Sequence, residues 1–394
     1  MMKGKEQMIA ASEPALAPGP LAREASESVG TFTPQSPAPG PLARKAGESV
    51  GTFTAQSLAP SPLAREAGEG QGVLTPESLS PLWFVRYRIT LIPRTSLVLP
   101  LHSRGSTIRG AFGITLRRLV CHDIDLVCRT CSLEPTCAYP QSFEPRPPAN
   151  SDRLSNFQDV PRPFVFDPPA TESPDFPSGV PVTFGLTAIG RATRLVPYFV
   201  SAFRTLADEG LGPRRAKFDL VNVAALDARG AATAIYENTT PLVRLTAPTL
   251  RAADLVKPGD SRRTNLALRF TTPLDLKDHG VPVGIPEFAP LIRRLRDRAN
   301  ALATFFADGP LHLDFKGISA LAEGVKLVKN GTRLIEINRT SSRTGQRHDV
   351  GGLVGEAEYE GDGIGKLMAL VRIGEVVHAG KHAAFGNGGM EVGG

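Results

Sequence analysis

Residues 85–91, Val-Arg-Tyr-Arg-Ile-Thr-Leu, alternate apolar side chains with polar ones. This period of two predicts a β-strand with one buried face. After a loop, residues 106–112 read Ser-Thr-Ile-Arg-Gly-Ala-Phe, and Ile108, Phe112 and Leu116 share one face of a helix, with Ser106 as a suitable N-cap. The two stretches predict a strand followed by a helix that packs on it.

The same half of the chain continues this pattern. We expect an extended stretch at 162–166, a strand at 182–188, a helix at 195–209 and a strand at 217–223. Together with the first strand and helix, the order is β-α-β-β-α-β, which is the ferredoxin-like unit. A cysteine-rich insertion follows the first helix.

The second half repeats the order. The periodicity predicts a strand at 266–272, a helix at 287–306, strands at 325–328, 334–337 and 353–359, a helix at 364–373 and a strand at 390–392. The predicted fold class is therefore α+β, with two tandem ferredoxin-like (βαββαβ) domains at residues 81–230 and 260–394. The second domain contains a glycine-rich loop.

The first 80 residues have a different composition. Pro-Leu-Ala-Arg occurs at 20–23, 41–44 and 62–65, a period of 21 residues. Pro, Gly, Ala and Ser dominate, and too few apolar residues are present to offset the entropy of ordering. We expect residues 1–80 to be a disordered tail without a catalytic role, either a tether or a neutral expansion of a coding repeat.

Charge is unevenly distributed along the chain. The net charge is +6, with six basic and eight acidic residues in positions 1–80, so the rest carries +8. A basic folded part suits a polyanion, although an ordinary soluble surface would look the same. The sequence has no run of about 18 apolar residues and no secretory signal at its start, so we expect a cytoplasmic protein without a membrane partner.

All four cysteines lie within 17 residues. Their spacing is C-x6-C-x2-C-x5-C, and four thiolates can hold zinc tetrahedrally. The pattern predicts a structural zinc site, and the alternative is a loop of reduced thiols without metal. The predicted ligands are Cys121, Cys128, Cys131 and Cys137.

Several segments together resemble one protein family. Residues 105–113, Gly-Ser-Thr-Ile-Arg-Gly-Ala-Phe-Gly, resemble the opening helix of the RAMP proteins of CRISPR systems, and most closely their precursor-RNA-processing endoribonucleases. Residues 162–165, 341–356 and 378–388 resemble later segments, so the similarity covers about 83–392. His382 stands where the family pattern has glycine.

The resemblance implies a metal-independent endoribonuclease, with zinc at most a structural ion. In this chemistry the ribose 2′-hydroxyl attacks the adjacent phosphate and leaves a 2′,3′-cyclic phosphate. Histidine suits the acid and base roles because its pKa lies near neutrality, and a cation stabilises the phosphorane. The candidate catalytic residues are His102, His378 and Lys381.

The RNA contacts are expected from arginines and from the glycine-rich loop, where backbone can approach phosphate. Each arginine could instead form a surface ion pair. The candidate RNA-binding residues are Arg109, Arg343, Arg347, Gly380, Gly386 and Gly388.

Three readings remain open at this point. The first is an endoribonuclease that cuts CRISPR repeat RNA and has repeat RNA, crRNA and effector-complex subunits as partners. The second is a non-catalytic RAMP-type subunit that binds crRNA in an effector complex. The third is an RNA-binding protein outside CRISPR systems that a structural zinc ion stabilises.

Overall fold

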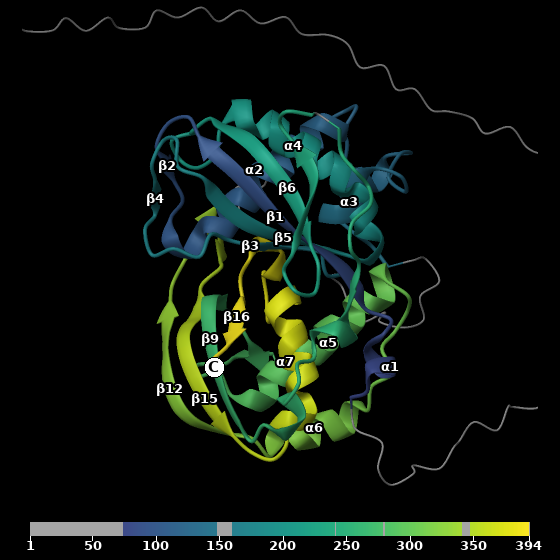
Figure 1. Cartoon of the computed structure of the whole chain (residues 1–394), viewed down its shortest axis with the longest axis vertical. Helices are drawn as coiled ribbons and strands as arrows, with labels where there is room; N and C mark the ends of the chain where they lie inside the picture. Colours follow the sequence, from purple (N-terminus) through teal and green to yellow (C-terminus); the bar gives the residue numbers. More distant parts are fainter. Residues whose placement is uncertain (1–73, 148–159, 241, 279, 341–346, 394) are drawn as a thin grey trace, which may run out of the picture. The chain divides into compact units, whose positions relative to one another are not determined.

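The computed structural model describes residues 74–147, 160–240, 242–278, 280–340 and 347–393 (Figure 1). The predicted disordered tail falls almost entirely outside these ranges. Within them, none of the helices combines the length and the apolar character needed to cross a membrane.

The first half forms an antiparallel sheet in the order β3-β5-β1-β6-β7. Its six main elements follow one another as β-α-β-β-α-β, so the predicted ferredoxin-like unit is confirmed. They are β1 (Trp83–Pro93), α2 (Arg104–Val120), β3 (Phe164–Asp167), β5 (Val182–Ile189), α4 (Val196–Glu209) and β6 (Phe218–Leu226). Smaller elements in this half are α1 (Pro76–Leu79), β2 (Leu97–Val98), α3 (Ala138–Phe143), β4 (Asp175–Phe176), β7 (Ala232–Glu237) and β8 (Leu250–Arg251).

The core of this half is an aromatic cluster between the sheet and helices α2 and α4. Phe112 of α2 stacks on Phe203 of α4 at 4.9 Å between ring centroids, and Phe143, Phe164 and Phe166 surround it. Aromatic pairs of this kind contribute about 0.5–1.5 kcal/mol each beyond the burial of their area. The helix face predicted from the spacing of Ile108, Phe112 and Leu116 is therefore the buried one.

The second half has a four-stranded antiparallel sheet in the order β12-β15-β9-β16. This is the same arrangement as β3-β5-β1-β6, so the second ferredoxin-like unit is confirmed. Its elements are β9 (Asn265–Leu274), α5 (Phe288–Phe306), α6 (Phe315–Glu323), β12 (Lys326–Ile335), β15 (Gly352–Glu360), α7 (Ile364–Val377) and β16 (Met390–Val392). Short hairpins are formed by β10 (Lys277–Asp278) with β11 (Val281–Pro282), and by β13 (Asn338–Thr340) with β14 (Arg347–Asp349).

One prediction for this half was wrong, and one helix was missed. The strands expected at 325–328 and 334–337 are one strand, β12, which runs through Asn330-Gly331 and pairs with β15 along its length. Asn-Gly is a turn signal, but here the ladder to Glu356 and Ala357 keeps the segment extended. Helix α6 was not predicted from the sequence.

The two units meet where helix α2 begins. A Cβ added to Gly105 would lie 2.0 Å from the carbonyl oxygen of Phe385 and 3.2 Å from the Cα of Gly386. The backbone of α2 therefore packs directly against the backbone of the C-terminal glycine-rich loop, residues 380–389. Only glycine permits an approach this close.

Gly105→Ala is expected to destabilise the protein by about 1–3 kcal/mol, because the added methyl group overlaps backbone that cannot move aside. If the methyl group met no overlap, replacing glycine by alanine inside a helix would stabilise the folded protein by about 1 kcal/mol. The sign of the change in unfolding free energy therefore shows whether the overlap exists. Urea unfolding of the full chain measures the change. Gly284→Ala is the control, since a Cβ there meets nothing within 4 Å, and an equal effect of both substitutions would refute the close contact.

Candidate active site

A buried arginine organises the N-terminal side of the site. Arg104, the first residue of α2, is 4% exposed and donates from Nη1 to the carbonyl oxygen of Pro169 at 2.8 Å and from Nη2 to that of Ser173 at 2.6 Å. It also donates to the carbonyl oxygen of Thr171. One guanidinium thus fixes three carbonyls of a single loop and holds that loop against the start of α2.

His102 lies next to this arginine, in the short 3-10 turn Leu101–Ser103. Its side chain is partly buried, and its pKa is lowered, first by burial and then by the positive charges of Arg333 and Arg104. Glu172, carried by the loop that Arg104 holds, acts in the opposite direction and raises the pKa. Because Arg333 belongs to β12, the second unit contributes charge to a histidine of the first.

The glycine-rich loop forms the C-terminal side of the site. Gly380, Gly386 and Gly388 all have positive φ, at 73°, 83° and 70°. A Cβ on Gly388 would lie 1.8 Å from the carbonyl oxygen of Ala379, so the loop is folded tightly on itself. The observed close approaches of these glycines are to protein backbone, and their contact with phosphate stays a prediction.

His378 is buried under this loop. It is 2% exposed, and its Nδ1 lies 3.2 Å from the carbonyl oxygen of Asn387, a hydrogen bond in which the ring nitrogen donates. Burial is the main cause of its lowered pKa. In this position the imidazole ties the two ends of the loop together, whereas His102 keeps part of its surface exposed.

The remaining cationic candidates are distributed as follows. Lys381 has an exposed side chain, and its backbone N–H donates to Asp275 at 3.0 Å. Arg347 begins β14, where it pairs with Thr340 of β13, but its side chain is not among those described. Arg343 lies outside the described residues.

Arg109 has a role that the sequence did not indicate. Its guanidinium carbon lies 4.7 Å from the ring centroid of Phe143 and 4.1 Å from that of Phe385. Cation–π contacts therefore connect α2 both to the cysteine-rich insertion and to the glycine-rich loop. The predicted contact with RNA remains untested, and the observed contacts make Arg109 a link between the two units.

The predicted zinc site is not supported. Cys121, Cys128, Cys131 and Cys137 line one small cavity, but no group of three or more His, Cys, Asp or Glu side chains in the described ranges is arranged to hold a metal ion. Cys121 Sγ donates to the carbonyl oxygen of Asp123 at 2.9 Å. Burial raises the pKa of the Cys128 and Cys137 thiols. Packing of Tyr139 on Phe143, with ring centroids 5.1 Å apart, anchors the insertion instead.

His382, which replaces the glycine of the family pattern, adopts a left-handed conformation with φ 60° and ψ 19°. Its ring contacts Phe385 edge to face at 5.5 Å. The backbone geometry expected of glycine is therefore kept although the residue differs, and the aromatic contact offsets part of the cost of a non-glycine residue at positive φ.

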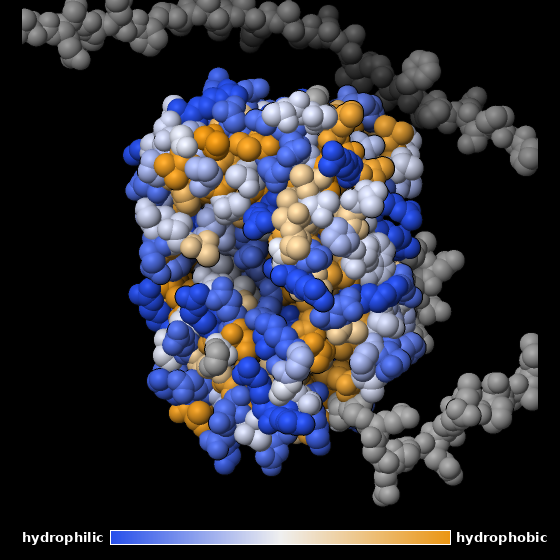
Figure 2. Space-filling model, in the orientation of Figure 1, coloured by the Kyte–Doolittle hydropathy of each residue, from blue (hydrophilic) through white to orange (hydrophobic). Residues whose placement is uncertain are grey.

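The arrangement can perform acid–base chemistry on an anion. A partly exposed imidazole with a lowered pKa lies among cationic groups, on a helix start that contacts the loop carrying Lys381. Arg333 and Glu172 were missed by sequence reasoning, because neither lies near His102 in the chain and neither belongs to a recognisable motif. The face of the molecule in Figure 2 is largely hydrophilic, with hydrophobic side chains gathered in separate patches.

Comparisons with known proteins cover most of the described chain. Residues 268–390 match the family model of the CRISPR-associated endoribonuclease Cas6. Residues 80–248 match the model of an N-terminal domain named AF_1859_N. An uncharacterized protein of Archaeoglobus fulgidus is 24% identical over 292 residues, which are 73% of this chain and 91% of the relative.

Solved structures are similar at low identity. A Thermus thermophilus Cas6 is 15% identical with a TM-score of 0.44, and the match covers 79% of this chain and 98% of the other. A RAMP protein described as binding different RNA substrates is 10% identical with a TM-score of 0.40, covering 79% of this chain and all of the other.

The charges around His102 predict opposite effects of two substitutions. Arg333→Met removes a positive neighbour and is expected to raise the pKa of His102, whereas Glu172→Gln removes a negative one and is expected to lower it. Titration of the imidazole by NMR measures both shifts. Lys329→Met on the same strand is the control, because Lys329 pairs with Glu358 and should leave His102 unchanged. Shifts of the same sign in both variants would contradict the proposed environment.

Proposed function

We propose that the protein binds and cuts CRISPR repeat RNA, because residues 268–390 match the family model of the CRISPR-associated endoribonuclease Cas6. The observation that carries the proposal is the setting of His102. It is the candidate histidine that keeps part of its surface exposed, and its pKa is lowered by burial and by arginines from both units.

We assign His102 the role of general base. A lowered pKa keeps the imidazole neutral at pH 7, ready to accept a proton. It takes the proton of the ribose 2′-hydroxyl, the 2′-oxygen forms a bond to phosphorus, and the bond from phosphorus to the 5′-oxygen breaks. The products are a 2′,3′-cyclic phosphate and a 5′-hydroxyl, with the leaving 5′-oxygen taking its proton from solvent.

The cations have electrostatic roles in this scheme. Lys381 and Arg333 neutralise charge on the phosphorane, because fixed positive groups stabilise the transition state more than the ground state. His378 is a positioning residue that holds the glycine-rich loop through Asn387. Since side chains supply base and cations, the proposed reaction is metal-independent.

The proposed partners are repeat RNA, the crRNA product and subunits of a CRISPR effector complex. The alternative, a non-catalytic RAMP-type subunit that only binds crRNA, shares the fold and the charge. Incubation of the purified protein with labelled repeat RNA in EDTA separates the two. A single cut with a cyclic-phosphate end supports the enzyme, and tight binding without any cut supports the alternative.

His102→Ala is expected to lower the cutting rate by about 10²–10⁴-fold, the usual contribution of a general base, with little change in RNA affinity. Single-turnover cutting and filter binding on the same RNA measure the two quantities. His312→Ala, at another exposed histidine, is the control and should cut at the normal rate. An unchanged rate in His102→Ala would remove His102 from the mechanism.

The pH dependence follows from the direction of the pKa shift. A base works only when unprotonated, so cutting should be lost as pH falls through the pKa of His102, below the ordinary value of 6.5. Arg333→Met should move this acid limb to higher pH. A single-turnover rate profile in buffers of constant ionic strength measures the limb, and a limb that does not move in the variant would argue against His102 as the titrating group.

A further inference from the structure

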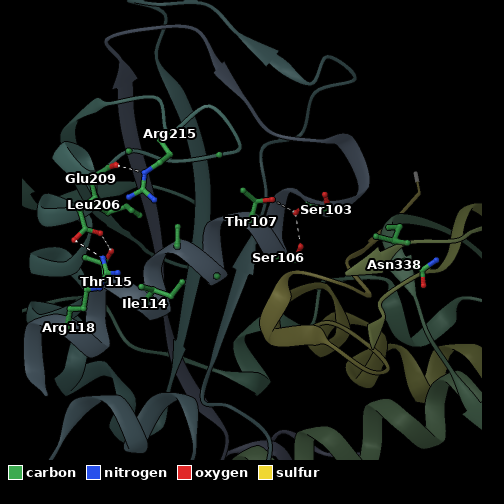
Figure 3. Close-up of a pocket in the computed structure, with 15 residues that line it drawn as sticks. Ser103, Ser106, Thr107, Ile114, Thr115, Arg118, Leu206, Glu209, Arg215 and Asn338 are labelled. Atoms are coloured by element: carbon green, nitrogen blue, oxygen red, sulfur yellow. Dashed lines mark hydrogen bonds and ion pairs between the residues drawn. The ribbon is translucent and has the colours of Figure 1, made fainter. Parts of the chain in front are cut away.

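A trough with a mixed polar and apolar lining runs along helix α2, on the side of the helix away from Ile108, Phe112 and Leu116. It has a volume of about 490 Å³ and is lined by α2, by the end of α4, by the following turn and by residues 337–338 of the second unit. This volume lies within the range of about 300–1,000 Å³ usual for ligand sites. Figure 3 shows its lining side chains.

One end of the trough adjoins the proposed active site. Ser103 and Thr107 line it there, with Asn338 facing them from the second unit (Figure 3). Ser103 directly follows His102 in the chain. Since a helix rises about 1.5 Å per residue, the trough extends about 22 Å from Ser103 to Arg118. A polymer cut at His102 can therefore continue into it.

The other end contains a carboxylate held by two neighbours on α2. Glu209 Oε2 accepts from the Thr115 hydroxyl at 2.7 Å, and Oε1 lies 3.6 Å from Nη1 of Arg118. The Glu209 side chain is 27% exposed. Each carboxylate oxygen has a second lone pair, so both can still accept a hydrogen bond from a ligand.

A tight turn places a second arginine beside the backbone of Glu209. Leu211 and Ala216 exchange two backbone hydrogen bonds of 2.9 Å, and a Cβ on Gly210 would lie 2.2 Å from the carbonyl oxygen of Arg215. Arg215 Nε donates to the backbone carbonyl of Glu209 at 3.3 Å. Two arginines and one carboxylate line this end of the trough, so its net charge is positive, which suits a phosphodiester chain.

We propose that the trough holds the single-stranded RNA adjoining the cut and reads one guanine with Glu209; the inference rests on the proposed RNA-cutting function. Sequence in RNA is read from unpaired bases through their hydrogen-bonding edges. The Watson–Crick edge of guanine presents N1–H and the N2 amino group side by side, so it donates to both oxygens of a carboxylate. Adenine and cytosine place a ring-nitrogen acceptor beside their amino group, which repels the carboxylate.

Binding of fluorescein-labelled trinucleotides U-N-U to the full chain, measured by anisotropy, tests the proposal. The central base N is guanine, inosine, adenine or cytosine, and inosine lacks only the N2 amino group. Guanine should bind about tenfold more tightly than inosine, the lower end of what a good bidentate contact provides. Glu209→Gln should abolish this preference, since the amide replaces one acceptor by a donor.

Two further variants distinguish recognition of the guanine base by Glu209 from general electrostatic attraction of the RNA. Arg215→Gln should weaken all four trinucleotides alike and keep the preference for guanine. Glu237→Gln changes an exposed carboxylate on β7 and should leave both affinity and preference intact. Equal affinity for guanine and inosine in the unaltered protein, absence of binding to every trinucleotide, or a preference that survives Glu209→Gln would each overturn the proposal.

The outcome is distinguishable from failure of the proposed function. If the protein cuts repeat RNA but shows no Glu209-dependent preference, the trough does not read guanine and the enzyme assignment stands. If the preference is present but no RNA is cut, the trough is a binding site on a non-catalytic protein.

Discussion

Contact between two stretches of backbone, without intervening side chains, determines the geometry of the candidate site. Gly105 of α2 meets Phe385 and Gly386 of the glycine-rich loop at a distance that no Cβ could tolerate. His102 lies three residues before this contact and Lys381 four residues before Phe385, so the separation of proposed base and proposed cation depends on it. Arg109, held between Phe143 and Phe385, supports the same junction.

Much of the fold could be predicted from the sequence because its elements follow local rules. Burial of side chains follows directly from two sequence patterns, the alternation in residues 85–91 and the helical spacing of Ile108, Phe112 and Leu116. The predictions failed where pairing overrode a local signal, as at Asn330-Gly331, where the ladder to β15 keeps a turn dipeptide extended. The cysteine spacing predicted a zinc site that the structure does not support, because no group of three or more His, Cys, Asp or Glu side chains in the described part of the chain is arranged to hold a metal ion.

The candidate site was only partly predictable, for a different physical reason. Sequence reasoning named His102 and the glycine-rich loop as candidates, and their roles stay predictions. Arg333 and Glu172 affect the pKa of His102 only because the folded chain brings them close to it. The role of Arg104 follows from its hydrogen bonds to three backbone carbonyls, which the sequence does not show. The two histidines also differ in exposure, since His378 is buried and His102 is partly exposed, and no local sequence pattern predicts this difference.

The order of the glycine-rich loop in the chain has a consequence for biosynthesis. Translation proceeds from the N-terminus, so residues 380–389 leave the ribosome after all the segments they cover. The first turn of α2 is therefore exposed to water at this contact while the second unit is made. The proposed active site would then be completed only late in synthesis, once the glycine-rich loop has been made.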